Sequence, residues 1–200
     1  MLLALLAFGA GGSVPRPKAT VARNGALTVT LPAALLQSRE IRQQLTSGLT
    51  TVFVLTVTAS GDGGTAKGGA RIDVRLDLWE EKYLVTVLEP TGQERKLTFA
   101  GEAALAKWWS ETPVPVTAPR KYGQTVDVEV KLKMLPFSSQ EQSDTQRWLS
   151  RTLSRGRAPS GEFTPAQSAE ILRIIVETSV RRRPLLEYHW SVRAIREAAR

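Results

Sequence analysis

Residues 70–78 read Ala70-Arg71-Ile72-Asp73-Val74-Arg75-Leu76-Asp77-Leu78. Apolar and charged side chains alternate along this stretch, and successive side chains of a β-strand point to opposite faces of its sheet. The stretch therefore predicts a strand with one buried face and one solvated face. A second strict alternation covers residues 126–134, whose apolar members are Val126, Val128, Val130, Leu132 and Met134. Two such strands predict an antiparallel sheet with one solvated face.

Further strands are predicted on both sides of these two stretches. Residues 50–58 are rich in β-branched side chains and apolar on both faces, which is typical of a central strand. Asn24-Gly25 separates two β-prone runs and predicts a tight hairpin. Shorter strands are expected at residues 83–88, at 96–99 and at the proline-flanked edge segment 114–117.

Capping residues and composition predict several helices. Residues 38–45 and 102–110 fit short helices, the second of which packs Leu105 on the sheet. Capping boxes at residues 138–141 and 164–167 open two more helices, and Pro184 ends the last one. Residues 185–192 fit either a strand or a helix, and residues 194–200 are expected to form a polar helical tail.

These elements predict an α+β fold, in which three or four helices pack on an antiparallel sheet that is curled or sandwich-like. Four regions are expected along the chain. They are a signal peptide at residues 1–13, a β-rich domain with short helices at 17–153, a linker at 154–163 and an Arg-rich helical segment at 164–200.

The first residues form an apolar run, from Leu2 to Ala10, that small residues follow. The run has the length of a secretory signal core and is far shorter than the ~20 residues of a membrane span, so no transmembrane span is expected. No Lys or Arg precedes the run, so the basic part of a signal peptide is missing. We expect a periplasmic or secreted protein whose mature chain begins between Ala10 and Pro17. A buried first strand and a cytoplasmic location form the alternative.

The content of Cys and His restricts the possible chemistry. The 200 residues are 42% hydrophobic, which suits a folded core, and they include no Cys and a single His, His189. The lack of Cys excludes disulfides, thiolate metal sites and cysteine nucleophiles. A single His argues against an imidazole metal site and against a Ser-His-Asp triad. We therefore expect no metal, no cofactor and no catalytic residue.

The formal net charge of +8 is concentrated near the C-terminus, because residues 146–200 hold eleven Arg, no Lys and five Glu. Arginine makes bidentate contacts with carboxylates and phosphates. Arg181, Arg182 and Arg183 are therefore predicted to contact an acidic partner, an anionic surface or a nucleic acid. The simpler interpretation is a solvated, basic tail.

Two further motifs have plain structural interpretations. The glycine-rich residues 61–69 lack the order of a phosphate-binding loop, since Gly68 rather than Ser or Thr follows Lys67, and they predict a flexible hairpin tip. Glu80 and Glu81 are interpreted as a charged strand end rather than a calcium site or an acid–base pair.

Tryptophan supplies the candidate contact residues, and the chain has five. Trp108 and Trp109 are neighbours on a predicted helix, so their rings cannot share one helix face. One of them is expected to be exposed, and an exposed Trp is a frequent energetic centre of an interface with a partner or a glycan.

A series of apolar and aromatic motifs runs through residues 21–149. They are Ser47-Gly48-Leu49 before Phe53-Val54-Leu55, then Leu78-Trp79-Glu80-Glu81-Lys82-Tyr83, Phe99 with Ala104-Leu105, and Leu135-Pro136-Phe137-Ser138 before Trp148. In these motifs the chain resembles an uncharacterised family of exported bacterial β-rich domains. The resemblance implies export and a β-rich domain, and it supplies no activity and no site.

The sequence is compatible with three functions. The leading hypothesis is a non-catalytic envelope or periplasmic module that binds another envelope protein or an anionic surface. The first alternative is a cytoplasmic nucleic-acid-binding protein that uses Arg181, Arg182 and Arg183. The second is a hydrolase that works through carboxylates such as Glu80, Glu81 or Asp127.

Overall fold

The computed structural model describes residues 15–61, 64–122, 125–135 and 183–197 as an α+β fold that consists mostly of strands. Its largest element is a six-stranded sheet in which every neighbouring pair is antiparallel. The strands follow each other in the order β6 (Glu94–Ala100), β5 (Lys82–Leu88), β4 (Gly64–Asp77), β3 (Thr51–Gly61), β8 (Val126–Leu135) and β9 (Leu186–Arg193).

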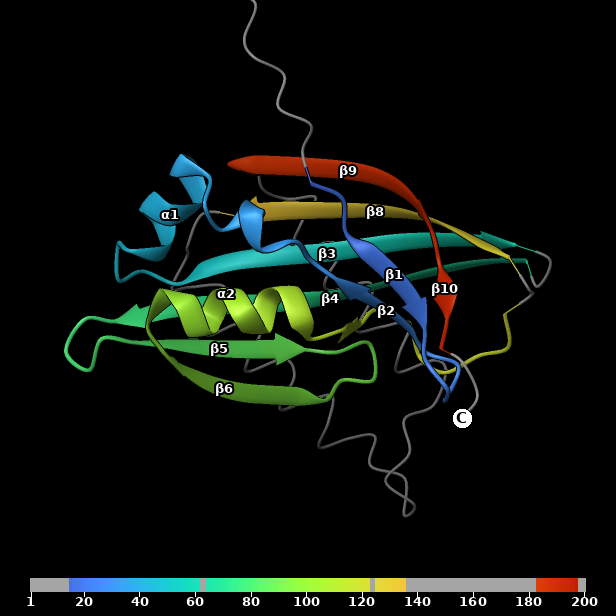
Figure 1. The fold of residues 1–200 in the computed structure, drawn as a ribbon, viewed down its shortest axis with the longest axis horizontal. Helices are drawn as coiled ribbons and strands as arrows, with labels where there is room; N and C mark the ends of the chain where they lie inside the picture. The colour runs from blue at the N-terminus through green and yellow to red at the C-terminus, as the bar shows by residue number, and fades with distance from the viewer. Residues whose placement is uncertain (1–14, 62–63, 123–124, 136–182, 198–200) are drawn as a thin grey trace, which may run out of the picture.

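A smaller sheet of four strands lies across one face of the large sheet (Figure 1). Its strands follow the order β10 (Ile195–Arg196), β1 (Lys18–Val21), β2 (Leu27–Thr30) and β7 (Val114–Pro115). This sheet is mixed, because β10 runs parallel to β1 while the other pairs are antiparallel.

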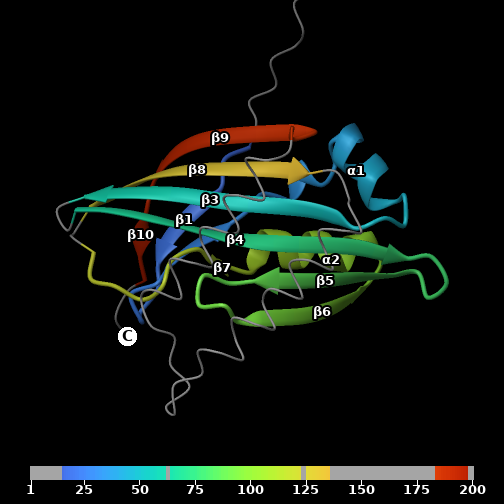
Figure 2. The same ribbon diagram turned by 180° about the vertical axis from the view of Figure 1, so that it is seen from behind.

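Two α-helices and one 3₁₀ turn cover the same face of the large sheet as the small sheet does (Figures 1 and 2). They are η1 (Ala33–Leu35), α1 (Arg39–Leu45) and α2 (Gly101–Glu111). Ser38 caps α1 by accepting a hydrogen bond from the Ile41 amide at 3.4 Å. The molecule therefore has two layers, with its main core between them.

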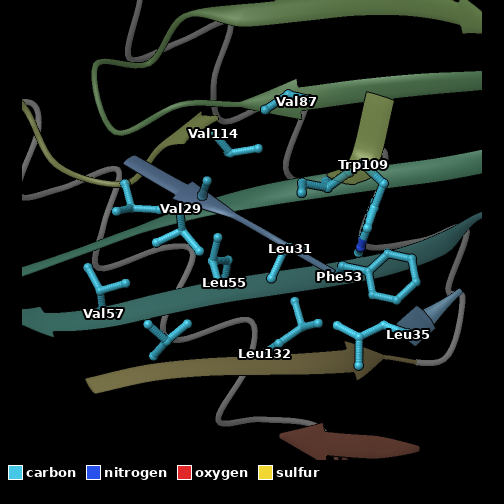
Figure 3. Close-up of a cluster of buried hydrophobic side chains, with 14 of the residues drawn as sticks. Val29, Leu31, Leu35, Phe53, Leu55, Val57, Val87, Trp109, Val114 and Leu132 are labelled. Atoms are coloured by element: carbon cyan, nitrogen blue, oxygen red, sulfur yellow. The ribbon is translucent and has the colours of Figure 1, made fainter. Parts of the chain in front are cut away.

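The core contains side chains from both layers (Figure 3). Val29, Leu31, Leu35, Trp109 and Val114 of the covering layer meet the inward side chains of the large sheet, which include Phe53, Leu55, Val57, Val87 and Leu132. The Phe53 and Trp109 rings pack edge to face with their centroids 5.0 Å apart. This contact fixes α2 on the central strand β3.

The last strand joins the two sheets. β9 pairs with β8 over its whole length, and the chain then bends at Ala194 into β10, which pairs with β1 (Figure 1). Residues 186–193, left open between strand and helix, are thus a strand. The helical tail expected from residue 194 is wrong at Ile195 and Arg196, where pairing with β1 outweighs local helical composition. Within the segment expected to be helical, β9 therefore belongs to the large sheet and β10 to the small sheet.

Several expectations are confirmed. The Asn24-Gly25 turn joins β1 to β2, with Gly25 at φ +83° and the Asn24 side chain accepting from the Ala26 amide. Residues 70–77 and 126–134 of the two alternating stretches fall in β4 and β8, and the strand expected at 50–58 is the interior strand β3. The helices expected at 38–45 and 102–110 are α1 and α2.

Other expectations are corrected. The large sheet is not curled. The described residues contain two α-helices, and the other expected helices fall in residues that the structure does not describe. The solvated face predicted for residues 70–78 is partly closed, because Arg71 is buried there with Asp73. The flexible tip expected at 61–69 is mostly regular strand, since β4 begins at Gly64. The signal peptide at 1–13, the helices expected from 138 and 164 to 182, and the linker at 154–163 lie outside the described residues.

Candidate functional site

The described part of the chain exposes five large hydrophobic side chains, and three of them gather at one end of the molecule. These three are Leu49, Leu78 and Trp79, and we call them the tip patch. Trp79 is 97% exposed, whereas Leu78 and Leu49 are 62% and 54% exposed. Leu78 and Trp79 lie in the hairpin between β4 and β5, which projects at the left of Figure 1. Exposed apolar side chains that gather in this way mark interaction surfaces more often than scattered ones do.

The sequence gives the Trp79 hairpin a defined conformation. The Asp77 carboxylate accepts hydrogen bonds from the Trp79 amide at 3.0 Å and from the Glu80 amide at 3.2 Å. Glu81 adopts a left-handed conformation with φ 52°, and Lys82 pairs with Glu80 at 3.0 Å. An aspartate that binds amides two and three residues ahead stabilises a turn. Trp79 is therefore presented on a preformed turn.

The neighbouring loop between α1 and β3 completes the tip patch. Gly48 has φ +74°, and a Cβ built on it would lie 2.9 Å from Leu78 Cδ1. The Leu78 side chain therefore rests directly on the Gly48 backbone. Leu49 follows at the next position, so both loops carry exposed apolar side chains where they meet.

The hairpin that presents Trp79 is acidic, unlike the chain as a whole. Asp77, Glu80 and Glu81 outnumber Lys82 within residues 77–82, whereas the full chain has a net charge of +8. The Asp77 and Glu80 carboxylates are already engaged, in the turn and with Lys82 respectively. The tip patch thus combines exposed apolar side chains with a small excess of acidic residues in the hairpin.

Acid is expected to release the Asp77 turn with a midpoint below the ordinary pKa of aspartate. The hydrogen bonds from the Glu80 and Trp79 amides lower the pKa of Asp77, aided by Arg75 and Lys82. A carboxyl group whose pKa is lowered on folding contributes stability above its unfolded pKa and loses it as the pH falls through the folded pKa. The Trp79 and Glu80 amide NMR shifts should therefore titrate with a midpoint below the ordinary pKa of aspartate.

The Asp77→Asn variant is the control for this titration, because its amide oxygen still accepts hydrogen bonds but does not titrate. Its Trp79 and Glu80 amide shifts should not follow the carboxyl titration. A wild-type titration at the ordinary aspartate pKa would show that the turn does not hold the carboxylate.

The structure buries one member of the sequence-predicted Trp pair and leaves the other partly exposed; whether either contacts a partner stays a prediction. Trp109 is buried, and Trp108 is half-buried against Phe99 with ring centroids 5.4 Å apart. Among the described residues, the fully exposed Trp is Trp79. The alternation of residues 70–78 also places Leu78 on the buried face, but β4 ends at Asp77 and Leu78 is exposed in the turn.

The predicted Arg cluster is described in part. Arg183 is exposed before β9, and Arg181 and Arg182 lie outside the described residues. Their contact with an anionic partner stays a prediction.

A second feature is an open hollow of about 630 Å³ at the β3–β8–β9 side of the large sheet, which Val128 and Val192 line together with polar side chains. The polar side chains that line it are Thr58, Ser60, Asp127, Glu129, Ser191 and Arg193. Arg193 donates to Asp127 at 3.2 Å, and His189 lies 3.9 Å from Glu129. These charged side chains are more than half exposed, so solvent screens their interactions.

The carboxylates proposed for hydrolysis do not form one site. Glu80 and Glu81 lie at the exposed β4–β5 turn, whereas Asp127 lies on β8 and pairs with Arg193. Burial raises the pKa of Asp73, and the Arg71 guanidinium opposes that rise. Both Asp73 oxygens accept from Arg71, at 2.7 and 2.9 Å, so this carboxyl group belongs to a structural ion pair.

In the part of the chain that the structure describes, no three His, Cys, Asp or Glu side chains gather closely enough to hold a metal ion. Within the same ranges, no helix is long and apolar enough to cross a membrane. Comparison with protein-family models, with curated proteins and with solved structures found no match for this chain.

Proposed function

We propose that this protein is an exported, non-catalytic binding module whose contact site is the tip patch. The observation that carries the proposal is the Trp79 side chain, which is 97% exposed on a turn that Asp77 holds in place. Exposing a large aromatic ring to water is unfavourable, and ordering the backbone that carries it lowers the entropy cost of binding. Both properties suit a residue that becomes buried in a complex.

The remaining features agree with a binding role. The carboxylates and the single His are distributed over separate surfaces or engaged in ion pairs, as described above. Export is proposed on the apolar run at the start of the sequence, and the family resemblance points the same way.

Site-specific photo-crosslinking in producing cells tests the proposal. A photoreactive phenylalanine analogue replaces Trp79 in one variant of the full chain and Ile195 in another. Ile195 is the matched control, because it is apolar and 70% exposed but lies in β10, away from the tip patch (Figure 1). We expect a crosslinked product from position 79, protein or lipid, and little from position 195.

A second substitution keeps this experiment specific. Leu78→Ser removes a neighbouring apolar side chain from the surface and should reduce the product from position 79 without unfolding the chain, since Leu78 is exposed. Equal yields from positions 79 and 195, or no product from position 79, would overturn the proposal.

Nucleic-acid binding is the second candidate. It is favoured by Arg183, the member of the predicted Arg cluster that the structure describes, which is exposed. Deleting residues 164–200 would not test it cleanly, because the deletion removes β9 and β10. Charge reversal of Arg181, Arg182 and Arg183 leaves these strands in place. A salt-sensitive affinity for DNA or RNA that this variant loses would support the candidate over the tip patch.

A further inference from the structure

The shape of the tip patch restricts the kind of partner. The patch is a projection at the end of a hairpin, formed by three large side chains from two short loops (Figure 1). A stable protein–protein interface buries about 800 Å² on each partner and engages about 20–30 residues a side. Three side chains on a projecting turn provide far less than this area. A lipid surface does not require a large complementary area, because fluid lipid adapts to the shape that enters it.

The chemistry of the patch fits the interfacial region of a bilayer. Tryptophan combines a large apolar ring with an N–H donor and is enriched at the level of the lipid headgroups. Leu78 precedes it in the same turn and packs on Gly48 of the adjoining loop, where Leu49 is also exposed, so the two loops present three exposed apolar side chains at this end of the molecule. We propose that the tip patch inserts into the headgroup region of a phospholipid surface. This inference rests on the binding role proposed above.

The charge around Trp79 selects the type of lipid. Residues 75–82 carry three acidic side chains, Asp77, Glu80 and Glu81, and two basic ones, Arg75 and Lys82, of which Lys82 is paired with Glu80. Negative charge next to the inserted side chains is repelled by anionic headgroups. The tip patch therefore binds neutral, zwitterionic phospholipid, in contrast to the anionic surface that the basic C-terminal residues predict.

Vesicles of phosphatidylcholine test this inference on the full chain at physiological salt. We expect the protein to float with the vesicles and its tryptophan emission to shift to the blue. Brominated phosphatidylcholine should quench the emission contributed by Trp79, whereas Trp109 and Trp190 are buried in the protein core. Trp79→Ala should lower the affinity by about tenfold or more, since burying one large aromatic side chain is worth at least that factor.

Two variants and one lipid provide the controls. Ile195→Ala removes an exposed apolar side chain at another site and should bind vesicles as the wild type does. Leu78→Ser should weaken binding in the same direction as Trp79→Ala. Adding anionic phosphatidylglycerol should not strengthen the Trp79-dependent part of the binding.

The lipid inference and the binding role can fail separately. No binding to phosphatidylcholine vesicles, or equal binding of wild type and Trp79→Ala, overturns the lipid inference. A protein crosslinked at position 79 would then leave the binding role standing with a protein partner. If position 79 gives no crosslinked product either, both proposals are wrong.

Discussion

The Phe53→Ala variant is expected to lose about 3–5 kcal/mol of unfolding free energy, which is the usual range for removing a buried Phe ring. Phe53 is fully buried on β3, and its ring packs on the Trp109 ring of α2 with the two ring centroids 5.0 Å apart. The substitution removes the contact that fixes the helix on the central strand and leaves a cavity between the two layers. Urea unfolding of the purified chain, monitored by circular dichroism, gives the free energy.

Phe99→Ala is the matched control for this prediction. Phe99 makes a comparable ring contact with Trp108, at 5.4 Å, but it lies on the edge strand β6 and is only partly buried. Phe99→Ala should lower the unfolding free energy by less than half as much as Phe53→Ala does. Equal losses from the two variants would contradict the placement of the core between β3 and α2.

The Gly68→Ala variant is expected to lose about 3 kcal/mol or more of unfolding free energy, which exceeds the typical cost of an added core methyl group. A Cβ at Gly68 would lie 1.9 Å from the Val116 carbonyl oxygen and 2.7 Å from Thr117 Cγ2. The backbone after β7 cannot move away easily, because the Val116 amide donates to Leu27 at 2.8 Å and Thr117 Oγ1 accepts from the Leu27 amide at 3.0 Å. The methyl group must therefore displace one sheet from the other.

Gly64→Ala separates this close approach from a general effect of replacing glycine in β4. Gly64 has φ +88° but nothing within 4 Å of its added Cβ, so only the left-handed backbone is strained, at about 1 kcal/mol. Thermal unfolding of both variants should place Gly68→Ala well below Gly64→Ala in stability. The reverse order would show that the segment after β7 does not lie on β4 as described.

Local sequence signals account for most of the large sheet. The alternations at residues 70–78 and 126–134 predict their strands because a strand that is half buried repeats every two residues. The Asn24-Gly25 turn and the Ser38 cap are likewise chemical signals contained in a few neighbouring residues. None of these predictions needs information about distant parts of the chain.

Non-local contacts explain what the sequence did not predict. β9 pairs with β8 although 50 residues separate the strands along the chain, and β10 pairs with β1 near the other end of the chain. Gly68 is required by the approach of Val116, which no pattern around residue 68 reveals. Its glycine-rich neighbourhood indicates flexibility instead.

The candidate site was missed for a related reason. The alternation that predicts β4 continues through Leu78, one residue beyond the end of the strand. Asp77 ends the strand by accepting hydrogen bonds from the next two amides, and this places Leu78 and Trp79 in the turn. An Asp followed by two large apolar residues and Glu80-Glu81 was the available signal for an exposed turn.

The central claim is that this protein binds its partner through Trp79 and its neighbours in the tip patch. The most direct test is the yield of photo-crosslinked product at position 79, divided by the yield at position 195, in cells that produce the full chain. Binding through the tip patch predicts a ratio well above one that falls when Leu78 is replaced by Ser. A ratio near one, unchanged by Leu78→Ser, would contradict it.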